Sequence, residues 1–125
     1  MPILTGIVNH NFKAVVVIAI RGTEGREQTI EPMVDTGFSG YLSLPPAFVA
    51  TLGLPLIGTR PAKFANGTVE NVPIHRARIL WEGIERSITV MASGDDPLLG
   101  MATPAGYRIT IEVTPNGAVT IEEMN

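Results

Sequence analysis

The chain has 125 residues, of which 45% are hydrophobic and only 17% are charged, so it suits one packed domain over residues 1–125 and not a disordered chain. Its net charge is −3 and it has no basic stripe, which argues against nucleic acid as a partner. It has no cysteine, which excludes disulfides, thiol nucleophiles and cysteine-based metal sites.

The hydrophobic pattern along the chain is that of short β-strands. Apolar residues alternate with polar ones or form β-branched runs, and both patterns are typical of strands. In chain order, we expect strands over residues 3–8, 12–20, 28–34, 41–44, 62–65, 68–72, 73–81, 84–91, 107–113 and 118–121. Turn residues at Asn66-Gly67, Glu82-Gly83 and Asn116-Gly117 predict three hairpins.

One short helix is expected among these strands. Pro46–Leu52 has a proline in its first turn and is followed by Gly53, a residue that suits a left-handed helix cap. Residues 97–106 are ambiguous and could hold a second short helix after Gly100. The sequence therefore predicts an all-β fold with one or two short helices.

The N-terminal residues and the apolar runs bear on where the protein is found. Residues 1–10 lack the basic start and apolar centre of a signal peptide. The longest apolar run, residues 14–20, is far too short to span a bilayer. We therefore expect a cytoplasmic protein that has no membrane partner.

The most informative segment is residues 33–40, in which Asp35, Thr36 and Gly37 follow an apolar strand. An aspartate at the end of a buried strand is costly unless hydrogen-bond donors surround it. The Gly37 amide and the Ser39 hydroxyl are the expected donors to the Asp35 carboxylate. Asp-Thr-Gly is also ordinary turn composition and should occur by chance in roughly one or two of a hundred chains of this length. The triplet gains weight from its context, a hydrophobic strand before it and an extended segment ending in Leu44-Pro45 after it.

Residues 33–40 resemble the active-site loop of retropepsin-like aspartic proteases, in particular the small single-domain members found in bacteria. Leu98, Leu99 and Gly100 are similar to the segment that crosses this loop in the family. Residues 63–72, with Ala65, Asn66 and Gly67 around the tip, resemble the family's flap hairpin. Order and spacing agree over most of the chain. One departure is Phe38, where retroviral members usually carry Ala or Ser.

The resemblance implies a small closed barrel of the acid-protease type and an aspartic endopeptidase activity. It implies a homodimer in which each chain contributes one catalytic Asp35, supported by Thr36, Gly37 and Ser39. The two carboxylates would share one proton, and Thr36 would bond across the two-fold axis. The hairpin would close over an extended peptide or protein substrate. The chemistry needs no metal or organic cofactor.

Other readings of these residues stay open. The Phe38 departure favours a rival, a dimeric module of the same fold that binds peptides or proteins without cleaving them. A further alternative is a monomer that dimerises only with substrate or at some pH. Residues 2–8 and 118–122 could interleave with a partner, or could equally pair within one chain.

Polar residues outside the loop also have two readings. Asp95-Asp96 before Pro97 could supply a second carboxylate, but the segment is also strong turn chemistry. His10 and His75 lack a second ligand at metal spacing, and Ser39 and Ser43 lack the frame of a serine hydrolase.

Overall fold

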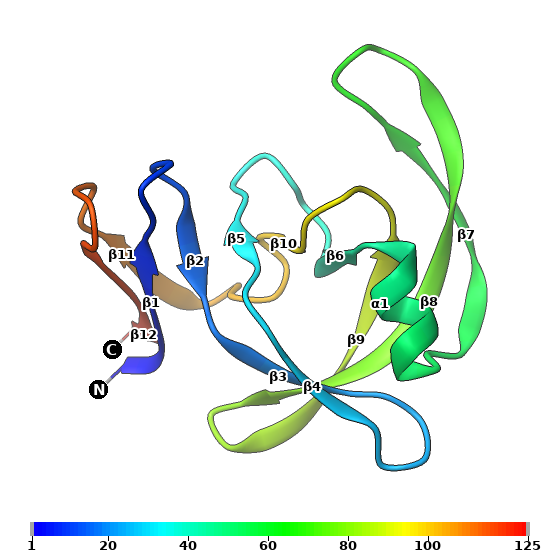
Figure 1. The fold of residues 1–125 in the computed structure, drawn as a ribbon, viewed down its shortest axis with the longest axis horizontal. Coiled ribbons are helices and arrows are strands. Elements are labelled where there is room, and N and C mark those ends of the chain that lie inside the picture. The colour runs from blue at the N-terminus through cyan, green and yellow to red at the C-terminus, as the bar shows by residue number, and fades with distance from the viewer. Residues whose placement is uncertain (1, 125) are drawn as a thin grey trace.

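The computed structural model describes residues 2–124, which form one 12-stranded sheet with a single helix (Figure 1). The strands are β1 (Pro2–Val8), β2 (Ala14–Val16), β3 (Ile18–Arg21), β4 (Glu27–Ile30), β5 (Met33–Val34), β6 (Leu42–Leu44), β7 (Leu56–Lys63), β8 (Val69–Trp81), β9 (Ile84–Ala92), β10 (Leu98–Leu99), β11 (Tyr107–Ile111) and β12 (Ala118–Glu123). The helix is α1 (Pro46–Leu52). No helix within residues 2–124 is long and apolar enough to cross a membrane. The all-β expectation is confirmed.

The sheet follows the path β11-β12-β1-β2-β5-β10-β6-β9-β8-β3-β4, with β7 paired to β8 outside it. Between residues 2 and 124, no pairing joins the end strands β11 and β4, so strand pairing does not close the barrel that we expected. The backbone between β2 and β3 joins the two parts of the sheet instead. β2 and β3 are separated only by Val17, yet β2 pairs with β1 and β5 whereas β3 pairs with β4 and β8. The strand predicted over residues 12–20 is therefore two strands that differ in their partners.

A second predicted strand, residues 28–34, is also divided. Pro32 separates β4 from β5, and a proline has no amide hydrogen with which to continue a ladder. The division moves the chain from the β3 side of the sheet to β2 and β10, where β5 leads directly into Asp35.

The helix forms as its sequence predicts. Pro46 lies in its first turn, and Gly53 ends it in the left-handed conformation, with φ 61° and ψ 38°. Its Val49 and Leu52 are buried against the core. Residues 101–106, in contrast, form successive turns and no second helix. Pro104 there has no amide hydrogen to donate, and Gly106 adopts a φ of 91° outside the helical region.

The apolar faces of the curled sheet meet in one core. Its fully buried side chains include Ile18, Ile20, Leu44, Val90 and Leu99. Hydrophobic burial of this kind is the main favourable term in folding. The core fixes the ends of β5, β6 and β10, which carry the loop described below.

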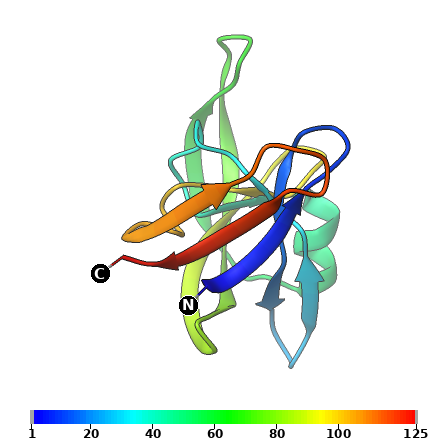
Figure 2. The ribbon, with the colours of Figure 1, turned by 90° about the vertical axis from the view of Figure 1, so that its left-hand side faces the viewer.

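The terminal strands pair within the chain. β1 lies between β12 and β2, and β12 also pairs with β11. Figure 2 shows β1 and β12 side by side, with both chain ends near one edge of the molecule. Of the two arrangements left open for residues 2–8 and 118–122, the structure therefore has pairing within one chain.

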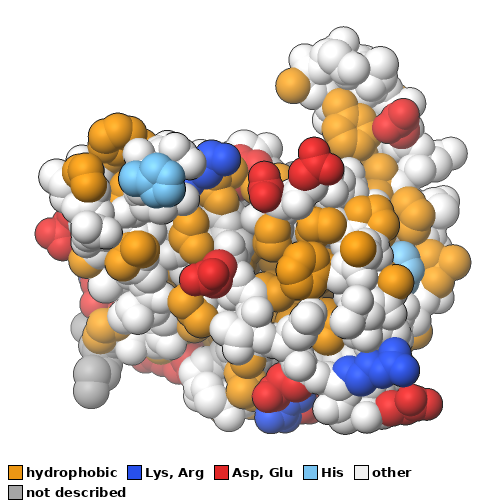
Figure 3. All heavy atoms as spheres, in the orientation of Figure 1, with side chains coloured by type: hydrophobic (Ala, Val, Ile, Leu, Met, Phe, Trp, Pro, Cys, Tyr) orange, Lys and Arg blue, Asp and Glu red, His pale blue; other side chains and the backbone are white. Residues whose placement is uncertain are grey.

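The β7–β8 hairpin projects beyond the rest of the molecule. It lies at the upper right of Figure 1, and Figure 3 shows it overhanging a hollow in the surface. The predicted Asn66-Gly67 turn is at its tip, where Gly67 has a φ of 85° and Thr68 donates to the Asn66 side chain. The paired strands extend to Leu56, further from the tip than the predicted strand 62–65.

Candidate active site

Asp35 is held by main-chain hydrogen bonds on both sides. Its amide donates to the carbonyl oxygen of Leu99 at 3.0 Å, and its carbonyl accepts from the amide of Phe38 at 3.1 Å. The Gly37 amide donates to carboxylate oxygen Oδ1 at 3.0 Å. A carboxylate with a fixed backbone and an amide donor has a defined orientation, which general acid–base chemistry requires.

The segment after β10 is hydrogen-bonded to the Asp35 loop and supports it. β10 lies between β5 and β6, parallel to the first and antiparallel to the second. Beyond β10, the amides of Gly100, Met101 and Ala102 donate to the carbonyls of Tyr41, Phe38 and Gly40, at 3.1, 2.8 and 3.1 Å. Three consecutive donors therefore hold the far side of the Asp35 loop.

Gly100 is required for this close approach. A Cβ atom added to Gly100 would lie 2.0 Å from the carbonyl oxygen of Gly40 and 2.8 Å from the Phe38 ring. The carbonyl oxygen and carbonyl carbon of Gly40 are main-chain atoms, so no rotamer change could make room for a side chain at position 100.

Arg86 on β9 holds the turn that follows. Its guanidinium donates to the carbonyl oxygens of Thr103 at 2.6 Å and Ala102 at 3.4 Å. It also lies 5.8 Å from the centre of the Tyr41 ring and 5.6 Å from that of Trp81. The buried Thr103 hydroxyl donates to the Tyr41 carbonyl at 2.7 Å. The turn and the loop thus share one hydrogen-bonded support.

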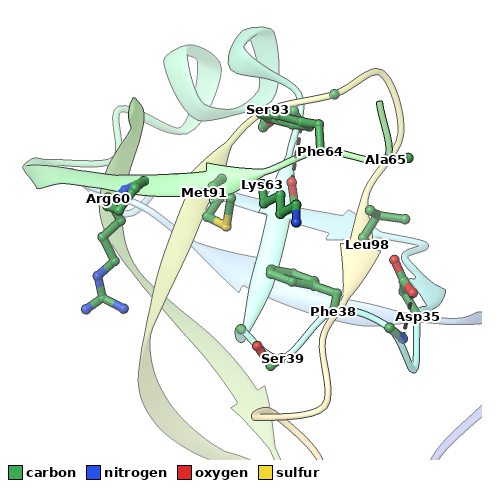
Figure 4. A pocket seen from close by; sticks show the side chains of 16 residues that line it. Asp35, Phe38, Ser39, Arg60, Lys63, Phe64, Ala65, Met91, Ser93 and Leu98 are labelled. Atoms are coloured by element: carbon green, nitrogen blue, oxygen red, sulfur yellow. Dashed lines mark hydrogen bonds between the residues drawn. The ribbon is translucent and has the colours of Figure 1, made fainter. Parts of the chain in front are cut away.

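A cleft of about 710 Å³ lies between the Asp35 loop and the β7–β8 hairpin (Figure 4). The loop contributes Asp35, Gly37, Phe38, Ser39 and Gly40 to its lining. The hairpin contributes residues 60–65, and the opposite wall contributes Ser43, Met91, Ser93, Gly94 and Leu98. This size and concave shape are typical of a ligand site.

The structure brings together about half of the site residues that the sequence predicts. Asp35, Gly37, Ser39, Ala65 and Leu98 all line the cleft. The other predicted residues, Thr36, Asn66, Gly67, Leu99 and Gly100, do not line it. Thr36 and the hairpin tip are exposed, whereas Leu99 and Gly100 are buried beneath the loop.

The predicted bond from Ser39 to Asp35 is absent. Within residues 2–124, no hydrogen bond joins the Ser39 hydroxyl to the Asp35 carboxylate, which accepts from Gly37. Figure 4 shows the Ser39 and Asp35 side chains apart from each other.

Sequence reasoning did not single out several residues of the cleft, of which Lys63 and Phe64 lie within the predicted hairpin. Phe64 and Met91 add apolar surface, and Arg60 and Lys63 add two cationic side chains. Among the lining residues, Asp35 is the one carboxylate. Extending the hairpin pairing outward from Asn66-Gly67 would have placed residues 60–63 beside the loop, since strand pairing has a fixed register. Within residues 2–124, no three His, Asp or Glu side chains converge as a possible metal site.

Comparisons with known proteins address the fold. No protein-family model matches the chain, and no curated protein sequence does. Solved structures do match. A crystal structure of a retropepsin-like aspartic protease from Rickettsia conorii is 19% identical, with a TM-score of 0.59 over 95% of this chain and 88% of that one. The chain has a retropepsin-like fold.

The comparison also finds the solution structure of the simian foamy virus (mac) protease. It is 18% identical, with a TM-score of 0.49 over 71% of this chain and 91% of that chain. Our prediction of a retropepsin-like all-β fold is confirmed by the Rickettsia structure. At such identities the likeness concerns the fold, so function must be argued from the site itself.

Proposed function

We propose that this protein is a homodimeric aspartic endopeptidase in which Asp35 of each chain forms half of the catalytic pair. The single observation that carries the proposal is the position of Asp35, fixed by amides at the floor of a cleft that an extended peptide could enter. The similarity of the fold to that of a retropepsin-like aspartic protease supports the proposal.

The requirement for a second chain follows from the chemistry of the cleft. Hydrolysis of a peptide bond needs a base to take a proton from water and an acid to protonate the carbonyl oxygen. Asp35 is the only acidic residue that lines the cleft of the described chain. Two Asp35 carboxylates in contact would share one proton, because adjacent like charges disfavour double ionisation, and would thus supply both roles.

The mechanism then proceeds by direct attack of water. The ionised carboxylate removes a proton from the water as the water oxygen bonds to the scissile carbonyl carbon. At the same time, the protonated carboxylate gives its proton to the carbonyl oxygen. The resulting tetrahedral intermediate collapses as the C–N bond breaks: the carboxylate that took the proton from water gives it to the nitrogen, and a hydroxyl of the intermediate returns a proton to the other carboxylate as the carboxylic acid product forms. The β7–β8 hairpin acts as a flap over this reaction, and its Phe64 and Ala65 already face the cleft.

The exposed side of the loop suits contact with a second copy. Thr36 and Gly37 are exposed, although Val34 before them and Leu42 after them pack into the core. In the dimer, Thr36 bonds to the loop of the partner across the two-fold axis. Because β1 and β12 are each paired on both edges within the chain, the loop tip is the contact on which the proposed dimer depends.

The test compares Asp35→Asn with Asp95→Asn, which changes an exposed carboxylate outside the cleft. Denatured casein is incubated with each variant from acidic to neutral pH. We expect the wild type and Asp95→Asn to cleave it, sensitive to a pepstatin-type inhibitor, and Asp35→Asn to be folded and inactive. Full activity in Asp35→Asn would overturn the proposal, and casein binding without products would favour the non-catalytic binding module.

A further inference from the structure

The charges on the wall of the cleft differ from those of the chain as a whole. The chain has a net charge of −3, but its cleft is lined by one acidic side chain, Asp35, and by two cationic ones, Arg60 and Lys63. A concave wall of one charge attracts ligands of the opposite charge more strongly than a flat surface does. The wall opposite Asp35 therefore favours anionic groups.

Arg60 and Lys63 form no ion pair among the described residues, 2–124. Within residues 2–124, the ion pairs involve Arg21, Arg26 and Arg78, and none involves Arg60 or Lys63. The nearest acid on the hairpin by register is Glu70, opposite Ala62. Glu70 neither lines the cleft nor forms an ion pair with either cation among the described residues. Both cations are thus available to an external carboxylate.

The two side chains are placed along the length of the cleft. Figure 4 shows Asp35 and Arg60 at opposite ends, with Lys63 between them and its side chain directed toward Phe38. Lys63 is three positions after Arg60 along β7, which is about 10 Å of extended chain. A peptide lying along β7 from Asp35 would therefore pass Lys63 first and Arg60 about three residues later.

Apolar side chains also line the cleft. Figure 4 shows Phe38 and Leu98 near Asp35, whereas Met91 lies nearer to Arg60. The cleft thus combines apolar surface beside the proposed catalytic carboxylate with cationic groups on the hairpin wall.

From this arrangement we infer that Lys63 and Arg60 are specificity-determining residues that select peptides with acidic side chains flanking an apolar cleavage site. The inference rests on the proposed function and adds the class of substrate to it. In the two-fold dimer, the same cations lie on each side of the scissile bond, so the preference holds on both sides. The carboxylates of the substrate bind the exposed Lys63 ammonium and Arg60 guanidinium through charge-assisted hydrogen bonds.

The test uses pairs of peptides that differ only by Glu or Gln at one position on either side of an apolar cleavage site. At the position that faces Lys63, we expect kcat/KM for the Glu peptide to exceed that for the Gln peptide roughly fivefold at low salt, since a partly exposed ion pair is modest in energy. The preference should shrink at high salt because ions screen it.

Substitutions then test whether the preference for Glu peptides depends on Lys63 and Arg60. Lys63→Gln should abolish it at that position, and Lys63→Glu should reverse it toward Lys peptides. Arg60→Gln should abolish it at the position further from the bond. Arg108→Gln, on β11 and outside the cleft, is the matched control and should leave it unchanged. Equal kcat/KM for all Glu and Gln peptides, or a preference that survives Lys63→Gln and Arg60→Gln, would overturn the inference.

A failure of the proposed function gives a different result. If the wild type cleaves none of the peptides, endopeptidase activity is refuted, and fluorescence anisotropy of the same labelled Glu and Gln peptides measures the charge preference separately. Tighter binding of the Glu peptides that is lost in Lys63→Gln would support the selection of acidic peptides, and equal binding would refute it.

Discussion

The main-chain amide of Asp35 donates to the carbonyl oxygen of Leu99, at 3.0 Å. This bond joins two segments that are far apart in the sequence, because β10 is inserted between β5 and β6. The position of the Asp35 carboxylate therefore depends on the crossing segment, Leu98, Leu99 and Gly100.

Gly100→Ala should destabilise the fold. Its Cβ atom would approach the Gly40 carbonyl to 2.0 Å, which forces the loop and the crossing segment apart. We expect a loss of at least about 1–3 kcal/mol in the free energy of unfolding, the usual cost of overpacking. Urea denaturation followed by tryptophan fluorescence measures it.

Gly37→Ala is the matched control within the same loop. A Cβ atom there would meet only the Asp35 carboxylate, at 3.4 Å, which is ordinary contact. We expect a change in stability of no more than about 0.5 kcal/mol. Equal stability of the two variants would contradict the role assigned to Gly100.

Arg86→Lys should also destabilise the support beneath the loop. Lysine keeps the charge, but it cannot donate to the Thr103 and Ala102 carbonyls in a planar fork while stacking on Tyr41. We expect a loss of about 1–2 kcal/mol. Arg108→Lys, at an exposed position of β11, should change the stability by less than about 0.5 kcal/mol. A similar loss in both variants would show that Arg86 has no special role.

His75 should make the protein less stable in mild acid. Burial lowers the pKa of His75 in the folded state. As pH falls through the ordinary histidine value of about 6.5, the unfolded chain therefore takes up a proton before the folded chain does, and the free energy of unfolding falls. This loss ends once the pH is below the folded-state pKa.

His75→Gln removes this titration, so the difference in stability between neutral and mildly acidic pH should be smaller in the variant than in the wild type. Urea denaturation at the two pH values measures both differences. Equal differences would show that His75 does not contribute to the acid sensitivity of the fold.

Local patterns predicted the local features of this protein well. Helix α1 has the predicted bounds because Pro46 and Gly53 each restrict one of its ends. The hairpin turns at Asn66-Gly67 and Glu82-Gly83 form as predicted, since residues with positive φ are needed there. The Asp35 loop also lies where a strand followed by Thr36-Gly37 indicated.

Features that depend on distant contacts were not predictable in the same way. The change of partners at Val17 leaves no mark in the sequence. Val16 and Ile18 are buried and Val17 between them is exposed, which is the alternation of one continuous strand. Most of β7, residues 56–61, escaped detection because the strand is almost entirely exposed and contains Gly58 and Pro61, so it lacks an alternating pattern. Arg60 and Lys63 were therefore not singled out from the sequence, although extending the hairpin pairing outward from Asn66-Gly67 reaches both of them.

The most direct test of the paired Asp35 mechanism is a mixing experiment. Wild-type protein is unfolded and refolded with an excess of Asp35→Asn, and native mass spectrometry with a mass-tagged variant verifies that mixed dimers form. At about a ninefold excess, random pairing leaves about one wild-type chain in ten with a wild-type partner, so peptidase activity per wild-type chain should fall about tenfold. Unchanged activity per wild-type chain would show that one Asp35 suffices and would contradict the dimeric mechanism.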